Sequence, residues 1–454
     1  MITDFTEDMF DDLPKRTRYL SYSYMIPYQP LEAIFAKASA YKGTRFFWQT
    51  PDRQFGLVGL GKNLLDEPTI GNVLRIKQLK KDFFKSFYFM GERKEQPVLF
   101  GGFPFNKNNR KTEVFWADLS TGYFVLPSVL IKQVKKELIV VITVKKEEKS
   151  LKRLFDEVTD WVQILDHLLG EVTLSFPQTQ VSLENELDVT TFLQSTKESI
   201  EEIRDPRNPM EKVVLARQME LRMEHFSVER LIDNLIRQQA NTYVFALETK
   251  KRCFVGATPE HLLHASATHF FTASIAGSIT RGKNDEEDRI LGEKLLKNSK
   301  NNNEHAIVVK KLTKQLANYT EGNLSVSNKK LLKNRDIQHL HLTISGIRKP
   351  KVSLFDVIQA LHPSPALGGE PKELAIQWLA KKEPSGRGLY GAPIGWCDVM
   401  EDIGEFAVGI RSGVFSENAG RLYAGCGIVG DSDPEEERQE THVKFQPMLR
   451  GVKE

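Results

Sequence analysis

Up to about residue 150, hydrophobic and polar positions alternate over short runs separated by glycine, proline and asparagine. This pattern is typical of strands joined by turns. The predicted strands are 45–48, 55–60, 98–105, 113–119 and 138–143. At 151–169 the hydrophobic positions take the spacing of an amphipathic helix. The chain therefore changes character near residue 150.

After residue 187, predicted helices and strands come in mixed order. The helices are 188–203, 227–239, 286–297, 305–319 and 372–382, and the strands are 212–220, 242–248, 404–415 and 421–428. Hairpin-like pairs of strands outnumber strand–helix–strand units, which favours an α+β fold. We divide the sequence into a β-rich N-terminal portion at 1–150, a helix with a variable linker at 151–187, and a C-terminal portion of the same fold at 188–454.

Composition narrows the class of protein. The formal net charge is +3 over 454 residues, so the overall field gives no reason to expect nucleic acid or a membrane as a partner. The cysteines at 253, 397 and 426 argue against a disulfide framework or a cysteine zinc site, and they predict a reducing, cytoplasmic environment. The acidic start lacks the pattern of a signal peptide, and the longest apolar run, 138–144, is too short to cross a bilayer.

The run AGCGIVGDSDPEEERQETHVK at 424–444 carries the strongest chemical signal. Asp433, followed by proline, predicts the start of a helix. That start puts Glu437, Glu440 and Lys444 on one helical face, an arrangement that suits a hard cation bridged to an anionic ligand. A solvated charged surface is the alternative interpretation. The glycines before the helix let the backbone approach a small ligand.

Five other residues could carry chemistry. Lys212 begins a strand, Glu260 lies in a strand-to-helix turn, and Glu304 lies in the first turn of a helix. Taken alone, each has an ordinary interpretation: Lys212 as an exposed lysine at a strand edge, and the two glutamates as acids stabilised by the dipole at the start of a helix. His339 and His341 share one face of a strand, which suits either a zinc pair or a packed, hydrogen-bonded histidine.

Taken in order, the segments around these residues resemble the signature segments of the chorismate-utilising enzymes. They are KVVLAR, ATPEHLL, SIAGSITRG, NNNEHAIVV, QHL, LHPSPALGGEP, GLYGAPIGW, FAVGIRSG and AGCGIVGDSDPEEERQET, and they cover roughly 190–450. The resemblance implies antiparallel sheets in a layered core with helices packed outside, and it makes 188–454 the chorismate-binding catalytic portion. Within the family, the sequence is most similar to isochorismate synthases of the menaquinone type.

The resemblance implies an isomerisation of chorismate in which water adds at C2 and the C4 hydroxyl leaves. Lys212 matches the general base of the water-adding members and Glu260 the general acid, and we expect both to be poorly solvated. Ala276 stands where aminodeoxychorismate synthases carry a nucleophilic lysine. Because water is added and ammonia is not, no glutamine amidotransferase subunit is expected. Salicylate synthase, which goes on to eliminate pyruvate, and a non-catalytic chorismate-binding protein are the alternatives.

The resemblance also implies a Mg²⁺ site, in which Glu304 and Glu440 are ligands and Glu437 acts through water or as a partial ligand. The second carboxylate of chorismate should be held by Arg411 with Tyr390, because a guanidinium can grip a carboxylate in a bidentate way. The full set of residues expected to contact the substrate is Tyr390, Arg411, Lys444, Gly277, Gly427 and His339.

Overall fold

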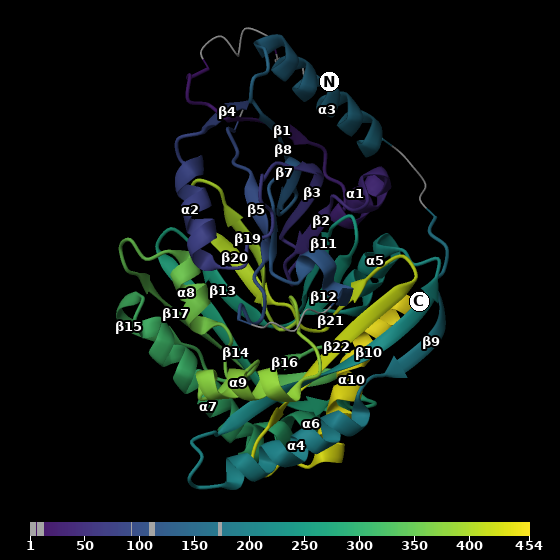
Figure 1. The fold of residues 1–454 in the computed structure, drawn as a ribbon, viewed down its shortest axis with the longest axis vertical. Helices are drawn as coiled ribbons and strands as arrows, with labels where there is room; N and C mark the ends of the chain where they lie inside the picture. Colours follow the sequence, from purple (N-terminus) through teal and green to yellow (C-terminus); the bar gives the residue numbers. More distant parts are fainter. Residues whose placement is uncertain (1–5, 7–12, 92, 109–113, 171–174) are drawn as a thin grey trace.

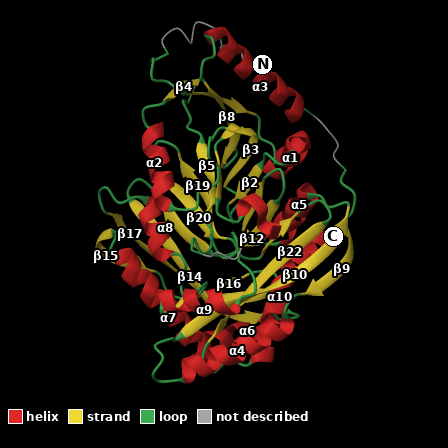
Figure 2. Ribbon diagram, in the orientation of Figure 1, coloured by secondary structure: helices red, strands yellow, loops and turns green. Residues whose placement is uncertain are grey.

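Two large β-sheets packed face to face form the centre of the molecule (Figure 1). The computed structural model describes residues 6, 13–91, 93–108, 114–170 and 175–454. Side chains from both sheets build the core between them, and the rings of Phe46 and Phe100 stack across it with their centroids 4.4 Å apart. Helices cover the outer faces, as Figure 2 shows. This arrangement confirms the α+β class and the layered antiparallel core.

The larger sheet contains thirteen strands of the described chain. They are β1 (Tyr19–Ile26), β2 (Phe46–Gln49), β3 (Phe55–Asn63), β4 (Phe87–Gly91), β7 (Pro127–Val134), β8 (Glu137–Lys145), β9 (Gln180–Glu186), β10 (Lys212–Glu224), β11 (Tyr243–Glu248), β12 (Cys253–Thr258), β18 (Gly369–Glu370), β21 (Ser412–Phe415) and β22 (Ala419–Ile428). Their order is β18-β10-β22-β21-β12-β11-β2-β3-β7-β8-β1-β4, and β9 also pairs with β10. Strands from both ends of the chain therefore share this sheet.

The smaller sheet contains nine strands of the described chain. They are β5 (Val98–Gly102), β6 (Tyr123–Val125), β13 (His261–Ala265), β14 (His269–Thr280), β15 (Thr320–Val326), β16 (Lys330–Lys333), β17 (Ile337–Arg348), β19 (Pro393–Asp398) and β20 (Gly404–Val408). Their order is β15-β17-β14-β13-β20-β19-β5-β6, with β16 paired to β17. In both sheets the described pairs are antiparallel, apart from the parallel pair of β1 and β4.

Helices cover the sheets on their outer sides. They are α1 (Leu31–Lys37), α2 (Val73–Phe83), α3 (Leu151–Leu169), α4 (Val189–Arg204), α5 (Val228–Gln238), α6 (Asp285–Lys297), α7 (Ser299–Ala317), α8 (Leu354–Leu361), α9 (Lys372–Lys382) and α10 (Pro434–Lys453), with short 3-10 helices at η2 (Ala38–Tyr41) and η3 (Val114–Leu119). Helices α1, α3, α5 and α10 share a hydrophobic core with the larger sheet, and α2, α7 and α8 share one with the smaller sheet. Within the described residues, no helix is both long and apolar enough to cross a membrane.

Three predicted segments differ from the structure. The strand expected at 113–119 is the 3-10 helix η3, and residue 113 lies outside the described residues. The linker at 170–187 contains strand β9, although 171–174 are also outside the described residues. The single strand expected at 404–415 is two strands, β20 and β21, in different sheets. The break occurs at Arg411, whose backbone has a left-handed φ of 48°.

Candidate active site

The candidate site lies where the chain passes from one sheet to the other. Glu260 is in the short link between β12 and β13, and 409–411 form the link between β20 and β21. Two backbone hydrogen bonds hold these links together: Val408 N–H donates to the Glu260 carbonyl at 2.9 Å, and Ala257 N–H donates to the Arg411 carbonyl at 3.0 Å. Glu260 therefore lies in a strand-to-strand link, and the predicted strand-to-helix turn was wrong.

A cavity of ≈ 190 Å³ lies beside these links. Predicted site residues that line it are Glu260, Gly277, Glu304, His339, Tyr390, Arg411, Gly427, Glu437, Glu440 and Lys444. Lys212 lies next to Gly427, which lines the cavity. A Cβ added to this glycine would be 3.0 Å from Lys212 Nζ and 3.1 Å from Glu304 Oε1. The cavity volume is well above the roughly 10–15 Å³ that one water molecule needs, so the cavity has room for a small ligand. All the predicted site residues are thus gathered in one place.

Glu260 is a buried acid with an altered protonation equilibrium. Its exposed fraction is 9%. Burial raises the pKa of Glu260 to about 7, although the positive charges of Arg411, Lys212 and Lys444 act to lower it. A carboxyl group with a pKa near neutrality is protonated for much of the time, so it can donate a proton as a general acid.

Lys212 is fully buried at the start of β10, which rules out an exposed lysine at the strand edge. Its Nζ donates a hydrogen bond to Glu304 Oε1 at 2.7 Å. Glu304 lies in the second turn of α7, where a first-turn position was predicted, because the helix begins earlier, with the Asn298 side chain as its cap. This ion pair holds Lys212 Nζ next to Glu304 and beside Gly427.

Helix α10 brings two acids and a lysine to the cavity, as its start predicts. The Asp433 side chain accepts hydrogen bonds from two N–H groups of the first turn. Lys444 Nζ lies 2.5 Å from Glu440 Oε1 and donates to the Gly425 carbonyl at 2.8 Å. Burial and the charge of Glu440 raise the pKa of Glu437. Burial also acts to raise the pKa of Glu440, but the positive charges of Lys444, Arg411 and Lys300 together keep it below its usual value.

The three glutamates offer the oxygen donors that a hard cation prefers. Glu437 Oε2 is buried and has no hydrogen-bond partner in the described part of the chain. Even so, no three acidic, histidine or cysteine side chains of the described residues stand close enough together to hold a metal ion. Mg²⁺ is usually held by only one or two protein carboxylates and keeps several waters. The carboxylates at this cavity, including the unpartnered oxygen of Glu437, fit such a cation when ligand and water oxygens complete its coordination.

The cavity also contains groups that are suited to an anion. Arg411 Nη2 lies 3.5 Å from His339 Nε2, and His339 Nδ1 lies 2.8 Å from Ser278 Oγ. Burial holds the pKa of His339 well below its usual value, so this imidazole is neutral. Tyr390 is buried, and Gly277 takes a left-handed φ of 74° in a bulge of β14. A guanidinium and a phenol in one cavity can bind a carboxylate.

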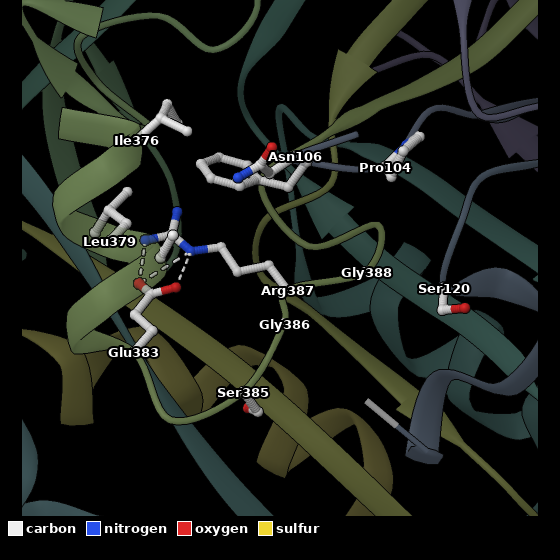
Figure 3. Close-up of a pocket in the computed structure, with 12 residues that line it drawn as sticks. Pro104, Asn106, Ser120, Ile376, Leu379, Glu383, Ser385, Gly386, Arg387 and Gly388 are labelled. Carbon is white, nitrogen blue, oxygen red and sulfur yellow. Dashed lines mark hydrogen bonds and ion pairs between the residues drawn. The ribbon is translucent and has the colours of Figure 1, made fainter. Parts of the chain in front are cut away.

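Arg387 is a cavity residue that sequence reasoning did not single out. Its Nη1 donates to the Leu367 carbonyl at 3.0 Å and its Nη2 to the Val214 carbonyl at 2.6 Å. Its Nε donates to Glu383 at 2.9 Å, an ion pair drawn in the close-up of a neighbouring cavity (Figure 3). Arg387 thus ties a cavity loop to β10 and α9. Its position directly before the segment GLYGAPIGW could have indicated from sequence that Arg387 belongs to the site.

Lys300 is a second residue of the cavity that sequence reasoning missed. It lies in the first turn of α7, one helical turn before Glu304, and this i, i+4 spacing was the available signal. Its neighbour Asn301 also lines the cavity and accepts a hydrogen bond from Ser278 N–H at 3.1 Å. The start of α7 therefore belongs to the site.

Comparison with known proteins identifies the family. Residues 6–453 match the family model described as chorismate binding enzyme. The chain is 35% identical to isochorismate synthase MenF of Bacillus subtilis over 95% of this chain and 93% of that protein. It is 36% identical to the salicylate biosynthesis isochorismate synthase of Pseudomonas aeruginosa over 53% of this chain and 50% of that protein. The structure of MenF, the menaquinone-specific isochorismate synthase of Escherichia coli, shows the same fold, with a TM-score of 0.81, 24% identity, and coverage of 96% of this chain and 95% of that one. This chain belongs to the chorismate-binding enzyme family.

Proposed function

We propose that this protein is an isochorismate synthase, which converts chorismate to isochorismate for menaquinone biosynthesis. The similarity to the Bacillus subtilis enzyme extends over nearly the whole of both chains. This supports its activity more strongly than the activity of a protein that matches only about half of this chain. The observation that carries the proposal is a buried lysine and a protonatable buried acid at one cavity, together with three further carboxylates. Proton transfer in two directions needs such a pair.

The reaction adds a water molecule and releases another. In the proposed mechanism, Lys212 accepts a proton as the water oxygen bonds to ring carbon C2. The ring double bonds shift, the bond between C4 and its oxygen breaks, and Glu260 gives its proton to the departing hydroxyl, which leaves as water. Atoms and charges balance when the proton on Lys212 returns to Glu260 before the next turnover.

The same proposal assigns the two carboxylates of chorismate to different parts of the cavity. Glu304 and Glu440 would hold Mg²⁺, with Glu437 bound directly or through water. When bound, the cation would neutralise the ring carboxylate. Arg411 and Tyr390 would hold the carboxylate of the enolpyruvyl group, because a guanidinium offers two parallel N–H donors.

The remaining proposed contacts complete the substrate site. Lys444 would contact the substrate beside Glu440, and the neutral imidazole of His339 can accept or donate a hydrogen bond without adding charge. Side chains at Gly277 and Gly427 would meet Asn301 and Lys212, respectively, so glycine keeps both backbones open to the ligand.

Product identification tests the function directly. The full chain is incubated with chorismate and Mg²⁺, and the products are separated by chromatography. We expect isochorismate, and we expect its formation to stop with a chelator and resume with added Mg²⁺. Sustained formation of salicylate and pyruvate would make the protein a salicylate synthase. Binding of chorismate without any turnover would make it a binding protein and refute the proposal.

A further inference from the structure

Each of the three glutamates at the proposed cation position faces a lysine. The distances from Nζ to Oε1 are 2.7 Å for Lys212–Glu304, 2.5 Å for Lys444–Glu440 and 3.6 Å for Lys300–Glu437. The proposed reaction gives a role to Lys212 and to Lys444. It gives none to Lys300, although this lysine lines the same cavity.

The environment of Lys300 differs from that of the other two lysines. Its side chain is 41% exposed, compared with 0% for Lys212 and 11% for Lys444. Its partner Glu437 is 4% exposed and keeps one oxygen without a hydrogen bond in the described structure. The 3.6 Å contact is therefore a loose one between a buried carboxylate and an ammonium that reaches it from solvent.

Lys300 also lines a second cavity, of ≈ 650 Å³, which is formed by the segments 203–211 and 429–431 and by the start of α7. Glu304 lines both cavities as well, so these two side chains lie between them. The flexible four-carbon stem of a lysine allows its ammonium to move from one cavity into the other without a change in the backbone.

We propose that Lys300 is a cationic placeholder at the divalent-cation position. Its ammonium neutralises Glu437 while no cation is bound, and it withdraws into the second cavity when a cation binds. This inference depends on the proposed function, because it takes Glu437 to face the cation. The pairing gives the buried carboxylate of Glu437 a compensating positive charge, and a buried charge without such compensation is costly. It also weakens cation binding, because the cation must first displace the ammonium.

The test measures cation binding without turnover. Mn²⁺ is the probe, because it takes the same oxygen ligands and its free form can be counted by electron paramagnetic resonance. We expect Lys300→Met to bind Mn²⁺ at least about tenfold more tightly than the unmodified chain, a difference of about 1.4 kcal/mol. Lys300→Gln should show the same change, and circular dichroism checks that both variants fold.

The matched control is Lys310→Met, which removes the same charge from an exposed position of the same helix, away from both cavities. We expect its Mn²⁺ affinity to equal that of the unmodified chain. Equal or weaker binding by the Lys300 variants, equal tightening by the control, or no Mn²⁺ binding by any chain would overturn the inference. Tighter binding by the Lys300 variants in a protein that makes no isochorismate would refute the proposed function and leave the placeholder role standing.

Discussion

Replacement of Glu260 by glutamine should remove most of the activity and stabilise the protein at and above neutral pH. Glutamine keeps the size and polarity of the side chain but has no acidic proton to donate. General acid catalysis contributes roughly 10²–10⁴-fold to rates, so kcat should fall by about this factor. The unmodified enzyme should lose activity as pH rises through about 7, because only protonated Glu260 can donate.

The stability effect follows from the raised pKa. The usual pKa of a glutamate, which applies to the unfolded chain, is 4.5, and burial raises the pKa of Glu260 to about 7. Between these values the folded state binds more protons than the unfolded state, so the free energy of unfolding falls as pH rises. The contribution is fully present below about pH 4.5 and is lost as pH rises through about 7. At about 1.4 kcal/mol per pKa unit, ionised Glu260 costs roughly 3 kcal/mol.

Thermal unfolding of the two proteins at several pH values measures this cost. With about 2.1 cal/mol/K of unfolding entropy per residue, a chain of this length gains roughly 3 °C in Tm from 3 kcal/mol. The Tm difference between Glu260→Gln and the unmodified chain should therefore grow by about 3 °C between about pH 5 and about pH 8. A difference that does not change with pH would refute the protonated state of Glu260.

Glu405 provides the matched control. It is another buried carboxyl group whose pKa is raised to about 7 by burial, although its hydrogen bond from Tyr243 opposes the shift. It does not line the cavity. Glu405→Gln should therefore show a similar gain in Tm at high pH and keep its activity. If Glu260→Gln also kept its activity, the general acid would have to be another group.

Three further changes test other parts of the site. Lys212→Met should lower kcat by roughly 10²–10⁴-fold with little change in the KM for chorismate, and steady-state kinetics that show an unchanged kcat would refute its role as base. Arg411→Lys should raise that KM by about tenfold or more, because an ammonium cannot make the bidentate contact; a change in kcat alone would contradict this role. Arg387→Met should lower the free energy of unfolding by roughly 3–5 kcal/mol in urea titrations, because it removes the guanidinium that is ion-paired with the buried Glu383 carboxylate. A loss below about 1 kcal/mol would mean that the ion pair is not structural.

Helix α10 shows what local sequence can predict. Its start depends on Asp433 and the proline after it, and helical spacing then fixes which side chains share a face. Glu437, Glu440 and Lys444 do line one cavity. Every interaction needed for that prediction lies within about three helical turns, so the tertiary structure adds only the partner that the face meets.

The rest of the site depends on contacts that periodicity does not reveal. Lys212 and Glu304 form an ion pair across 92 positions of sequence, and only the ordered family motifs indicated that they belong together. The sequence did not reveal that the chain leaves one sheet after β20 and enters the other at β21, because the residues on both sides of Arg411 have the pattern of a strand. A change of sheet alters the direction of the chain and leaves the alternation of side chains unchanged. The position of Arg411 was therefore not predictable from its neighbours.

The charges of the cavity imply that chorismate and the cation stabilise each other in the proposed function. With Glu260 protonated, three carboxylates face four cationic side chains, those of Lys212, Lys300, Lys444 and Arg411. Chorismate alone adds two negative charges and Mg²⁺ alone adds two positive ones, whereas both together add no net charge, and the withdrawal of Lys300 changes the charge of the cavity by only one unit. Each ligand therefore removes an electrostatic cost of binding the other. Because such coupling is reciprocal, Mg²⁺ must increase the affinity for chorismate by the same factor as chorismate increases the affinity for Mg²⁺.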